Sequence, residues 1–216
     1  MLVKPVSFFQ KIQLKSSLNE SLICRNLRAM LENAVEKRLM SDRKICCLLS
    51  GGLDSSLITS IVCKLIGDPK RVDTYSIGLP GSPDCEYAQK VADFLGTNHK
   101  NIIVDEQFFL SMIPEVVENI ESYDTTSVRA SVGNYLIAKF ISEHSDNVVV
   151  FNGDGSDELF GGYMYFHDAP GVSEYNQENL RLLTNIHFYD VLRSDRSISS
   201  HGLEPRTPFL DHDLAS

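Results

Sequence analysis

A turn with phosphate-binding character lies in CCLLSGGLDSSL, residues 46–57, where an apolar run meets two glycines and then a helix-forming stretch. Gly51 and Gly52 let the backbone approach an anion closely, and the N–H groups that begin a helix are free to bind it. The lysine usual in phosphate loops is missing, and Asp54 stands in its place. The turn by itself leaves open what a carboxylate would do beside a phosphate. Hydroxyl donors come from Ser50, Ser55 and Ser56.

A second loop, NGDGSDELFGGY at residues 152–163, is rich in glycine and carries Asp154, Asp157 and Glu158. Acids this close repel one another unless a cation or a proton lies between them. This loop is therefore a second cluster of glycines and acids at the end of a predicted strand. On spacing alone, a solvated acidic loop and acids that cap the next helix remain alternatives.

Strands that alternate with helices indicate a doubly wound α/β fold, with a mostly parallel sheet flanked by helices. Such sheets bind ligands outside the carboxyl ends of their strands, at a topological switch point. Both loops follow predicted strands, so we expect them to meet at that edge. The predicted strands cover 44–50, 72–79, 99–104 and 147–154. The predicted helices cover 55–67, 83–96, 128–143 and, with weaker periodicity, 174–200, and a loop is expected over 202–211.

The chain is expected to form one domain over residues 17–216, preceded by an N-terminal arm at 1–16. Ser17 and Glu20 have the spacing of a helix capping box. Apolar residues at helical spacing follow, which predicts an amphipathic first helix. This apolar stripe consists of Leu27, Met30, Leu31, Ala34 and Val35.

The composition, with 43% hydrophobic and 23% charged residues among 216, is typical of a globular protein. A net charge of −9 argues against a nucleic-acid partner, because such proteins usually present a basic surface. No apolar run reaches the ~18 residues of a membrane helix, and the N-terminus lacks the apolar core of a signal peptide. The five cysteines are expected to be small buried side chains, which favours a soluble cytoplasmic protein.

Two motifs carry a resemblance to a known family. SGGLDSS resembles the pyrophosphate-binding loop of the ATP pyrophosphatases (PP-loop proteins), which split ATP into AMP and pyrophosphate. GDGSDE resembles the GEGSDE signature of asparagine synthetases. Residues 17–216 are similar to the synthetase domain of glutamine-hydrolysing asparagine synthetases and of their β-lactam-forming relatives. Further matching segments, in the same order, cover 76–99, 121–131, 165–170 and 190–211.

The resemblance implies an adenine nucleotide alpha-hydrolase-like fold that uses ATP and Mg²⁺. Asp54 and Asp157 would hold the Mg²⁺. Leu48 and Ile77 would line the adenine and ribose pocket, with plain core packing as an equal alternative. Contacts with the nucleotide and its pyrophosphate would come from Ser50, Gly51, Gly52, Ser55, Ser56, Asn152 and Gly153.

The resemblance also assigns roles to charged residues. Arg196 matches a basic position that neutralises charge on the phosphates during adenylation, with a surface ion pair as the alternative. Arg129 would meet a carboxylate of the amino-acid substrate or form a structural salt bridge, and Glu158 would also contact that substrate. Glu204 and Arg206 are expected instead to lock the segment near the C-terminus to its neighbours.

The implied chemistry is ATP-dependent amide formation. The β-carboxylate of aspartate attacks the α-phosphorus of ATP, giving a β-aspartyl adenylate and pyrophosphate, and ammonia then attacks the acyl carbon. A carboxylate must accept the proton that leaves the new ammonium group, and Asp154 holds the matching position. The family has glutamate there, and aspartate is shorter by one methylene, or about 1.5 Å. A misplacement near 1 Å can lower a rate on the order of 10²-fold.

The resemblance covers only the synthetase part of such enzymes. Glutamine-using members begin with a catalytic cysteine, whereas Cys24 is the first cysteine here. We therefore expect free ammonia or a separate glutaminase subunit to supply nitrogen. At the other end, the match stops where family members continue. Two alternatives stay open: a catalytically impaired derivative that binds a nucleotide or a partner, and a related AMP-forming ligase such as a β-lactam synthetase.

Overall fold

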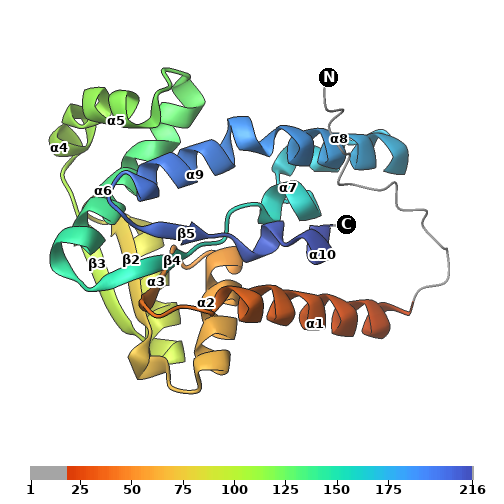
Figure 1. Cartoon of the computed structure of the whole chain (residues 1–216). Helices are drawn as coiled ribbons and strands as arrows, with labels where there is room; N and C mark the ends of the chain where they lie inside the picture. Colours follow the sequence, from red (N-terminus) through yellow and green to blue (C-terminus); the bar gives the residue numbers. More distant parts are fainter. Residues whose placement is uncertain (1–18, 216) are drawn as a thin grey trace, which may run out of the picture.

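The computed structural model describes residues 19–215, which contain a five-stranded parallel sheet (Figure 1). The strand order is β3-β2-β1-β4-β5, and each neighbouring pair is parallel. The predicted N-terminal arm at 1–16 lies outside the described residues. The strands are β1 (Lys44–Leu48), β2 (Asp73–Gly78), β3 (Asn98–Ile103), β4 (Asn147–Phe151) and β5 (Glu204–Arg206).

Helices cover both faces of the sheet, which confirms the predicted doubly wound class (Figure 1). One face carries α1 (Glu20–Arg38), α2 (Leu53–Ile66) and α3 (Pro83–Leu95). The other carries α6 (Thr125–His144) and α9 (Asp190–Ser199). The remaining helices are α4 (Glu106–Ser111), α5 (Ile113–Ile120), α7 (Ser156–Phe160), α8 (Val172–Asn185) and α10 (His212–Ala215).

β1 is covered on both faces, which explains its uninterrupted apolar run. Cys47 packs with Ile58 of α2, whereas Cys46 packs with Ile137 of α6. The adjacent cysteines thus point to opposite faces, as consecutive side chains of a strand do. All five cysteines are free thiols; the prediction of burial is confirmed for four of them and wrong for Cys24, which is exposed.

The loop predicted over 202–211 is wrong in part, because β5 forms within it at the edge of the sheet. β5 pairs with β4, with Pro205 opposite Val150. Three residues are too few to show strand periodicity, and a proline argues against a strand unless that strand lies at an edge. The Arg206 guanidinium donates to the Met40 carbonyl at 3.0 Å, so this side chain does lock the segment to its neighbours.

Side-chain caps decide where two helices begin. α6 starts before the predicted residue 128, because the Asp124 carboxylate accepts a hydrogen bond from the Ser127 N–H at 2.8 Å. α1 follows Asn19, whose side chain accepts from the Ser21 N–H at 2.9 Å. Ser17, half of the predicted capping box, lies outside the described residues. Periodicity locates the body of a helix, whereas its cap fixes the first residue.

The helices are amphipathic rather than wholly apolar. In α1, Leu31, Ala34 and Val35 are buried, but Leu27 and Met30 are 39% and 36% exposed, so the predicted stripe is only partly covered. Within residues 19–215, no helix is both long enough and apolar enough to cross a membrane.

Candidate active site

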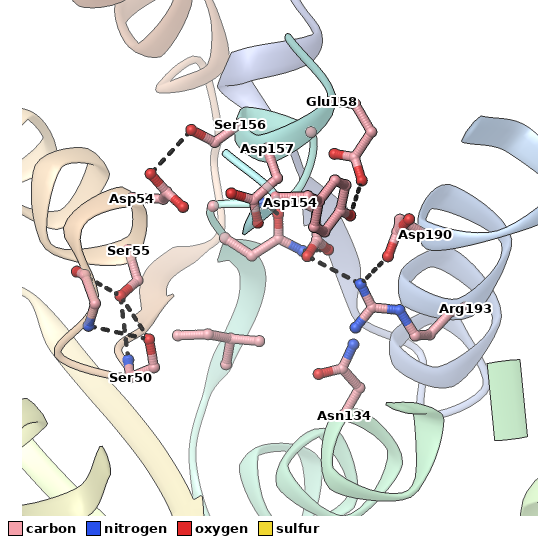
Figure 2. Close-up of a pocket in the computed structure, with 16 residues that line it drawn as sticks. Ser50, Asp54, Ser55, Asn134, Asp154, Ser156, Asp157, Glu158, Asp190 and Arg193 are labelled. Carbon is pink, nitrogen blue, oxygen red and sulfur yellow. Dashed lines mark hydrogen bonds and ion pairs between the residues drawn. The ribbon is translucent and has the colours of Figure 1, made fainter. Parts of the chain in front are cut away.

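The carboxyl ends of β1 and β4 lie side by side. From β1 the next strands of the chain, β2 and β3, extend the sheet to one side, whereas β4 and β5 extend it to the other. The glycine turn after β1 and the acidic loop after β4 therefore meet at the switch point, where doubly wound sheets bind ligands. A cavity of about 250 Å³ opens between them (Figure 2). Its lining includes Ser50, Gly52, Asp54 and Ser55 from the turn, and Asn152, Gly153, Asp154, Asp157 and Glu158 from the loop.

The glycine turn leaves backbone donors open at the start of α2. Gly52 caps the helix without a side-chain capping bond, and the first N–H groups of a helix have no intrahelical acceptor. The hydroxyls of Ser50 and Ser55 lie 3.0 Å apart, and the Ser50 N–H donates to the Ser55 hydroxyl at 3.2 Å. The Ser56 hydroxyl is buried, has no hydrogen-bond partner among residues 19–215, and is not part of the lining.

Two glycines lie at close approaches between elements, where a Cβ would overlap its neighbours at Gly51 and press tightly on them at Gly153. Gly51 has φ +79°, and a Cβ there would lie 2.5 Å from the backbone of Tyr87 in α3. A Cβ on Gly153 would lie 3.0 Å from the Ser55 nitrogen and 3.1 Å from the Asp54 Cβ. The close contact at Gly153 is thus with the start of α2, which brings the acidic loop against the glycine turn.

Asp54 and Asp157 both face the cavity, one from each strand end (Figure 2). Asp54 Oδ1 accepts a hydrogen bond from the Ser156 hydroxyl at 2.9 Å. Burial, followed by the negative charges of Asp54 and Asp190, raises the pKa of Asp157. Two carboxylates that face one cavity are suited to bind a divalent cation. No group of three or more metal-ligating side chains occurs within residues 19–215, so phosphate or water would complete the coordination.

The Asp154 carboxylate is held from two sides. Its Oδ2 accepts from Asn152 Nδ2 at 2.8 Å, and its Oδ1 lies 3.5 Å from the Arg193 guanidinium. Asn152 Nδ2 is also 2.8 Å from the Ser194 hydroxyl, so the loop is joined to α9. Burial raises the pKa of Asp154, and the positive charge of Arg193 opposes that shift.

Two further acids, Glu158 and Asp190, line the cavity together with Asp154. Glu158 is buried and accepts a hydrogen bond from the Tyr163 hydroxyl. Burial is the main cause that raises the pKa of Glu158, and the charge of Asp190 adds to it. Asp190 in turn accepts from Arg193 at 2.6 Å. Within residues 19–215, the cavity lining contains a single basic residue, Arg193, against five acids: Asp54, Asp154, Asp157, Glu158 and Asp190.

A second cavity of about 130 Å³ adjoins the first and is more apolar in its lining. Leu48 and Ile77, predicted to line an adenine and ribose pocket, both border it. Leu48, Ser50 and Asn134 line both cavities. The other residues of the second cavity are Leu49, Tyr75, Ser76, Asp84 and Ile137.

Four predicted site residues do not line either cavity: Gly51 and Ser56 beside the glycine turn, and Arg129 and Arg196 farther away. Arg129 is exposed on α6. Arg196 donates to the Ile120 carbonyl at 2.6 Å and lies 3.0 Å from the Glu121 carboxylate, at the end of α5. The basic group that reaches the cavity is Arg193, three residues earlier on α9.

Sequence reasoning missed Asn134, Tyr163, Asp190 and Arg193 as cavity residues. Asp190 and Arg193 lie in a segment that was recognised as similar to the family. Which of two arginines on one helix faces a cavity depends on how the helix is rotated, and weak periodicity leaves that undetermined. No sequence signal distinguishes Asn134 from other polar residues of its helix.

The fold and these loops define an α/β protein with an acidic cavity at the switch point of a parallel sheet. A family model described as "Asparagine synthase" matches residues 26–181 and 168–216. The chain belongs to the asparagine synthase family.

Several curated relatives are named "Asparagine synthetase [glutamine-hydrolyzing]". Those from Mesocricetus auratus and Homo sapiens are each 48% identical over 194 residues, or 88% of this chain and 35% of the relative. The protein from Gallus gallus is 46% identical over 206 residues, or 94% of this chain and 37% of its own length. The chain thus spans about a third of the length of these relatives.

Two solved structures match parts of this chain at low sequence identity. NMN synthetase from Francisella tularensis has a TM-score of 0.44 at 15% identity, covering 79% of this chain and 74% of its own. A predicted tRNA methyltransferase subunit from Methanocaldococcus jannaschii has a TM-score of 0.40 at 16% identity, covering 76% of this chain and 68% of its own.

Proposed function

We propose that this chain carries the synthetase site of an asparagine synthetase, which activates aspartate with ATP and forms asparagine, AMP and pyrophosphate. The observation that carries the proposal is the shared cavity: the glycine turn and the acidic loop supply Asp54 and Asp157 to the same space. Family membership supports the reaction class. The free thiols favour a reducing compartment such as the cytoplasm.

The residues of the cavity fit a divalent cation. Five acids and one arginine would repel the phosphates of ATP. Burial raises the pKa of Asp157, and the negative charges of Asp54 and Asp190 add to that shift. Asp54 and Asp157 would hold Mg²⁺ together with phosphate oxygens. The ion would neutralise charge on the pyrophosphate as it leaves.

The residues of the glycine turn serve the first step. Backbone N–H groups at the start of α2, with the Ser50 and Ser55 hydroxyls, would bind the β- and γ-phosphates. The aspartate β-carboxylate forms a bond to the α-phosphorus as the bond to pyrophosphate breaks, and that electron pair leaves with pyrophosphate. The product is a β-aspartyl adenylate. Adjacent turns hold the reactants together, which lowers the entropic cost of the reaction.

Asp154 would serve the second step. Ammonia attacks the acyl carbon, AMP departs, and the new ammonium group loses a proton to the Asp154 carboxylate. The raised pKa of Asp154 makes this carboxylate a better proton acceptor than an ordinary aspartate. Free ammonia, or ammonia from a separate glutaminase subunit, would be the nitrogen source.

One observation favours a second candidate, a nucleotide-binding derivative without turnover. Asn152 and Arg193 both engage the short Asp154 side chain and hold it toward α9. In that case the loops would still bind Mg²⁺ and ATP, but the amide-forming step would fail.

An assay of pyrophosphate release from ATP and Mg²⁺, with and without aspartate and ammonia, separates these functions. The synthetase proposal predicts that release requires aspartate and that added ammonia yields asparagine. Binding of ATP without turnover would favour the derivative instead. Release that requires a different carboxylic acid would indicate a related ligase, such as one that closes a β-lactam, and would overturn aspartate as the substrate.

A further inference from the structure

The two cavities share three lining residues, Leu48, Ser50 and Asn134, and we call the place where these residues lie the waist. Leu48 ends β1 and Ser50 begins the glycine turn. Asn134 belongs to α6, which packs on the sheet next to β2. A ligand that extends from one cavity to the other would lie against these three residues.

Asn134 occupies an apolar position of its helix. Ile137, Ala138 and Ile141 follow it at the spacing of one helix face, and all three are buried against the sheet. Core packing alone would place an apolar side chain at residue 134 as well. An amide at the end of this apolar stripe, at a position that lines both cavities, therefore indicates a role other than core packing.

The Asn134 amide is half-buried and has no hydrogen-bond partner among residues 19–215. Figure 2 shows it pointing from α6 toward Arg193, and Asn134 lines both cavities. An amide carries two donors and one acceptor oxygen, and leaving such a group unpaired in a partly desolvated site is unfavourable. A ligand at the waist would supply the missing partner.

We propose that Asn134 is a catalytic residue that donates a hydrogen bond to the α-phosphate of the nucleotide. The inference rests on the proposed function, in which adenosine occupies the apolar cavity and the β- and γ-phosphates occupy the acidic one. The α-phosphate then lies at the waist. Negative charge gathers on its non-bridging oxygens as the carboxylate attacks and pyrophosphate departs, and a fixed donor at that point stabilises the transition state.

A neutral donor suits this position because the adjacent cation is already engaged. Arg193 lies 2.6 Å from Asp190 and 3.5 Å from Asp154, so its charge is largely offset by carboxylates. Asn134 has no acid of its own among the described contacts. Its N–H groups are therefore free to bind phosphate without first breaking an ion pair.

The test compares two ligands in the presence of Mg²⁺: AMP, which has the α-phosphate, and adenosine, which lacks it. Asn134→Leu keeps the size of the side chain and removes the donor. We expect it to weaken AMP binding, measured by calorimetry, roughly tenfold or more, as for a lost hydrogen bond to a charged group. Adenosine affinity should change less than about twofold. Equal losses for both ligands, or no loss for AMP, would overturn the inference.

Asn134→Asp, which has the same shape but puts a carboxylate at the waist, should weaken AMP binding further. Ser142→Ala, at an exposed position of α6, is the matched control and should leave both affinities unchanged. Thermal unfolding separates function from structure. Because leucine suits an apolar stripe, the melting temperature of Asn134→Leu should equal or exceed that of the unmodified chain. If Asn134 served only the structure, the variant should melt at a lower temperature.

This experiment is distinguishable from a test of the proposed function. If the unmodified chain releases no pyrophosphate with aspartate, the synthetase proposal fails while the AMP and adenosine comparison still reports on Asn134. If the unmodified chain is active and Asn134→Leu retains full aspartate-dependent pyrophosphate release, the catalytic role fails alone.

Discussion

In the proposed mechanism, Asp154 is the side chain on which the amide-forming step depends most. Its carboxylate is held by Asn152 at 2.8 Å and by Arg193 at 3.5 Å, so the loop and α9 together fix its position. The GEGSDE signature that this loop resembles has glutamate at the matching position, and a glutamate carboxylate would extend about 1.5 Å farther. If Asp154 accepts the proton as proposed, the accepting oxygen is set back in this chain.

Asp154→Glu should raise the rate of asparagine formation from ammonia, by up to the order of 10²-fold if misplacement is the limiting defect. Asparagine and pyrophosphate would be measured in the same reaction, since their ratio isolates the second step. Asp146→Glu, at an exposed aspartate paired with Lys44, is the matched control. An unchanged ratio would show that Asp154 is not the displaced proton acceptor.

Asp157 should make cation binding depend on pH. Burial and the charge of Asp54 raise the pKa of Asp157. At any pH near this pKa, a larger fraction of Asp157 is therefore protonated than of an ordinary aspartate at the same pH. A proton competes with Mg²⁺ for the carboxylate. The affinity for Mg²⁺ with bound nucleotide should therefore rise as pH rises through the pKa of Asp157, with release of a proton.

Calorimetry in two buffers of different ionisation enthalpy measures that proton release. Asp157→Asn should abolish it and weaken Mg²⁺ binding, whereas the exposed control Asp146→Asn should leave both unchanged. Proton release that persists in Asp157→Asn would assign the titration to another group.

At the scale of elements, the contact between the glycine turn and α3 positions the site. Gly51 and Gly67 both have φ +79°, but a Cβ on Gly51 would overlap the α3 backbone, whereas nothing lies within 4 Å of one on Gly67. Substituting each of these two glycines therefore separates the cost of a left-handed backbone from the cost of a clash between the glycine turn and α3.

Gly67→Ala should cost about 1–2 kcal/mol of unfolding free energy, from the left-handed conformation alone. Gly51→Ala should cost about 1–3 kcal/mol more, because α3 must move, and it should also weaken ATP binding. Chemical denaturation and calorimetry would measure the two effects. Equal costs for both variants would mean that the packing of the turn against α3 does not hold the site.

The order of strands and helices could be predicted largely from sequence, because β1 and β4 are apolar runs and each is followed by a distinct glycine motif. β5 could not, because three residues with a central proline become a strand only by pairing with β4. The first residue of α6 was predicted wrongly because Asp124 caps this helix, and a polar capping residue does not contribute to the hydrophobic pattern from which the helix was predicted.

The candidate site was predictable where the chemistry is contained in one short motif. Each loop offered its acids as candidates, the family resemblance selected Asp54 and Asp157, and both line the cavity. Arg193 and Asn134 lie on helices whose rotation decides which residue faces the cavity. That rotation results from packing between distant segments, such as α6 against α9, which one sequence does not reveal.

At the scale of the whole molecule, charge is the dominant feature. The chain has a net charge of −9, and the cavity concentrates five acids around one arginine. An anionic nucleotide can bind such a surface well only if cations accompany it. The central claim is therefore that Asp54 and Asp157, from two strand ends far apart in sequence, hold one divalent ion with the nucleotide.

The most direct measurement of this claim is Mn²⁺ binding by electron paramagnetic resonance, with a non-hydrolysable ATP analogue present. The unmodified chain, Asp54→Asn, Asp157→Asn and the double variant form a double-mutant cycle. We predict that each single variant loses most of the Mn²⁺ affinity and that the double variant loses little more, because both carboxylates serve one ion. Losses that add independently, or Mn²⁺ binding that survives in the double variant, would contradict the account.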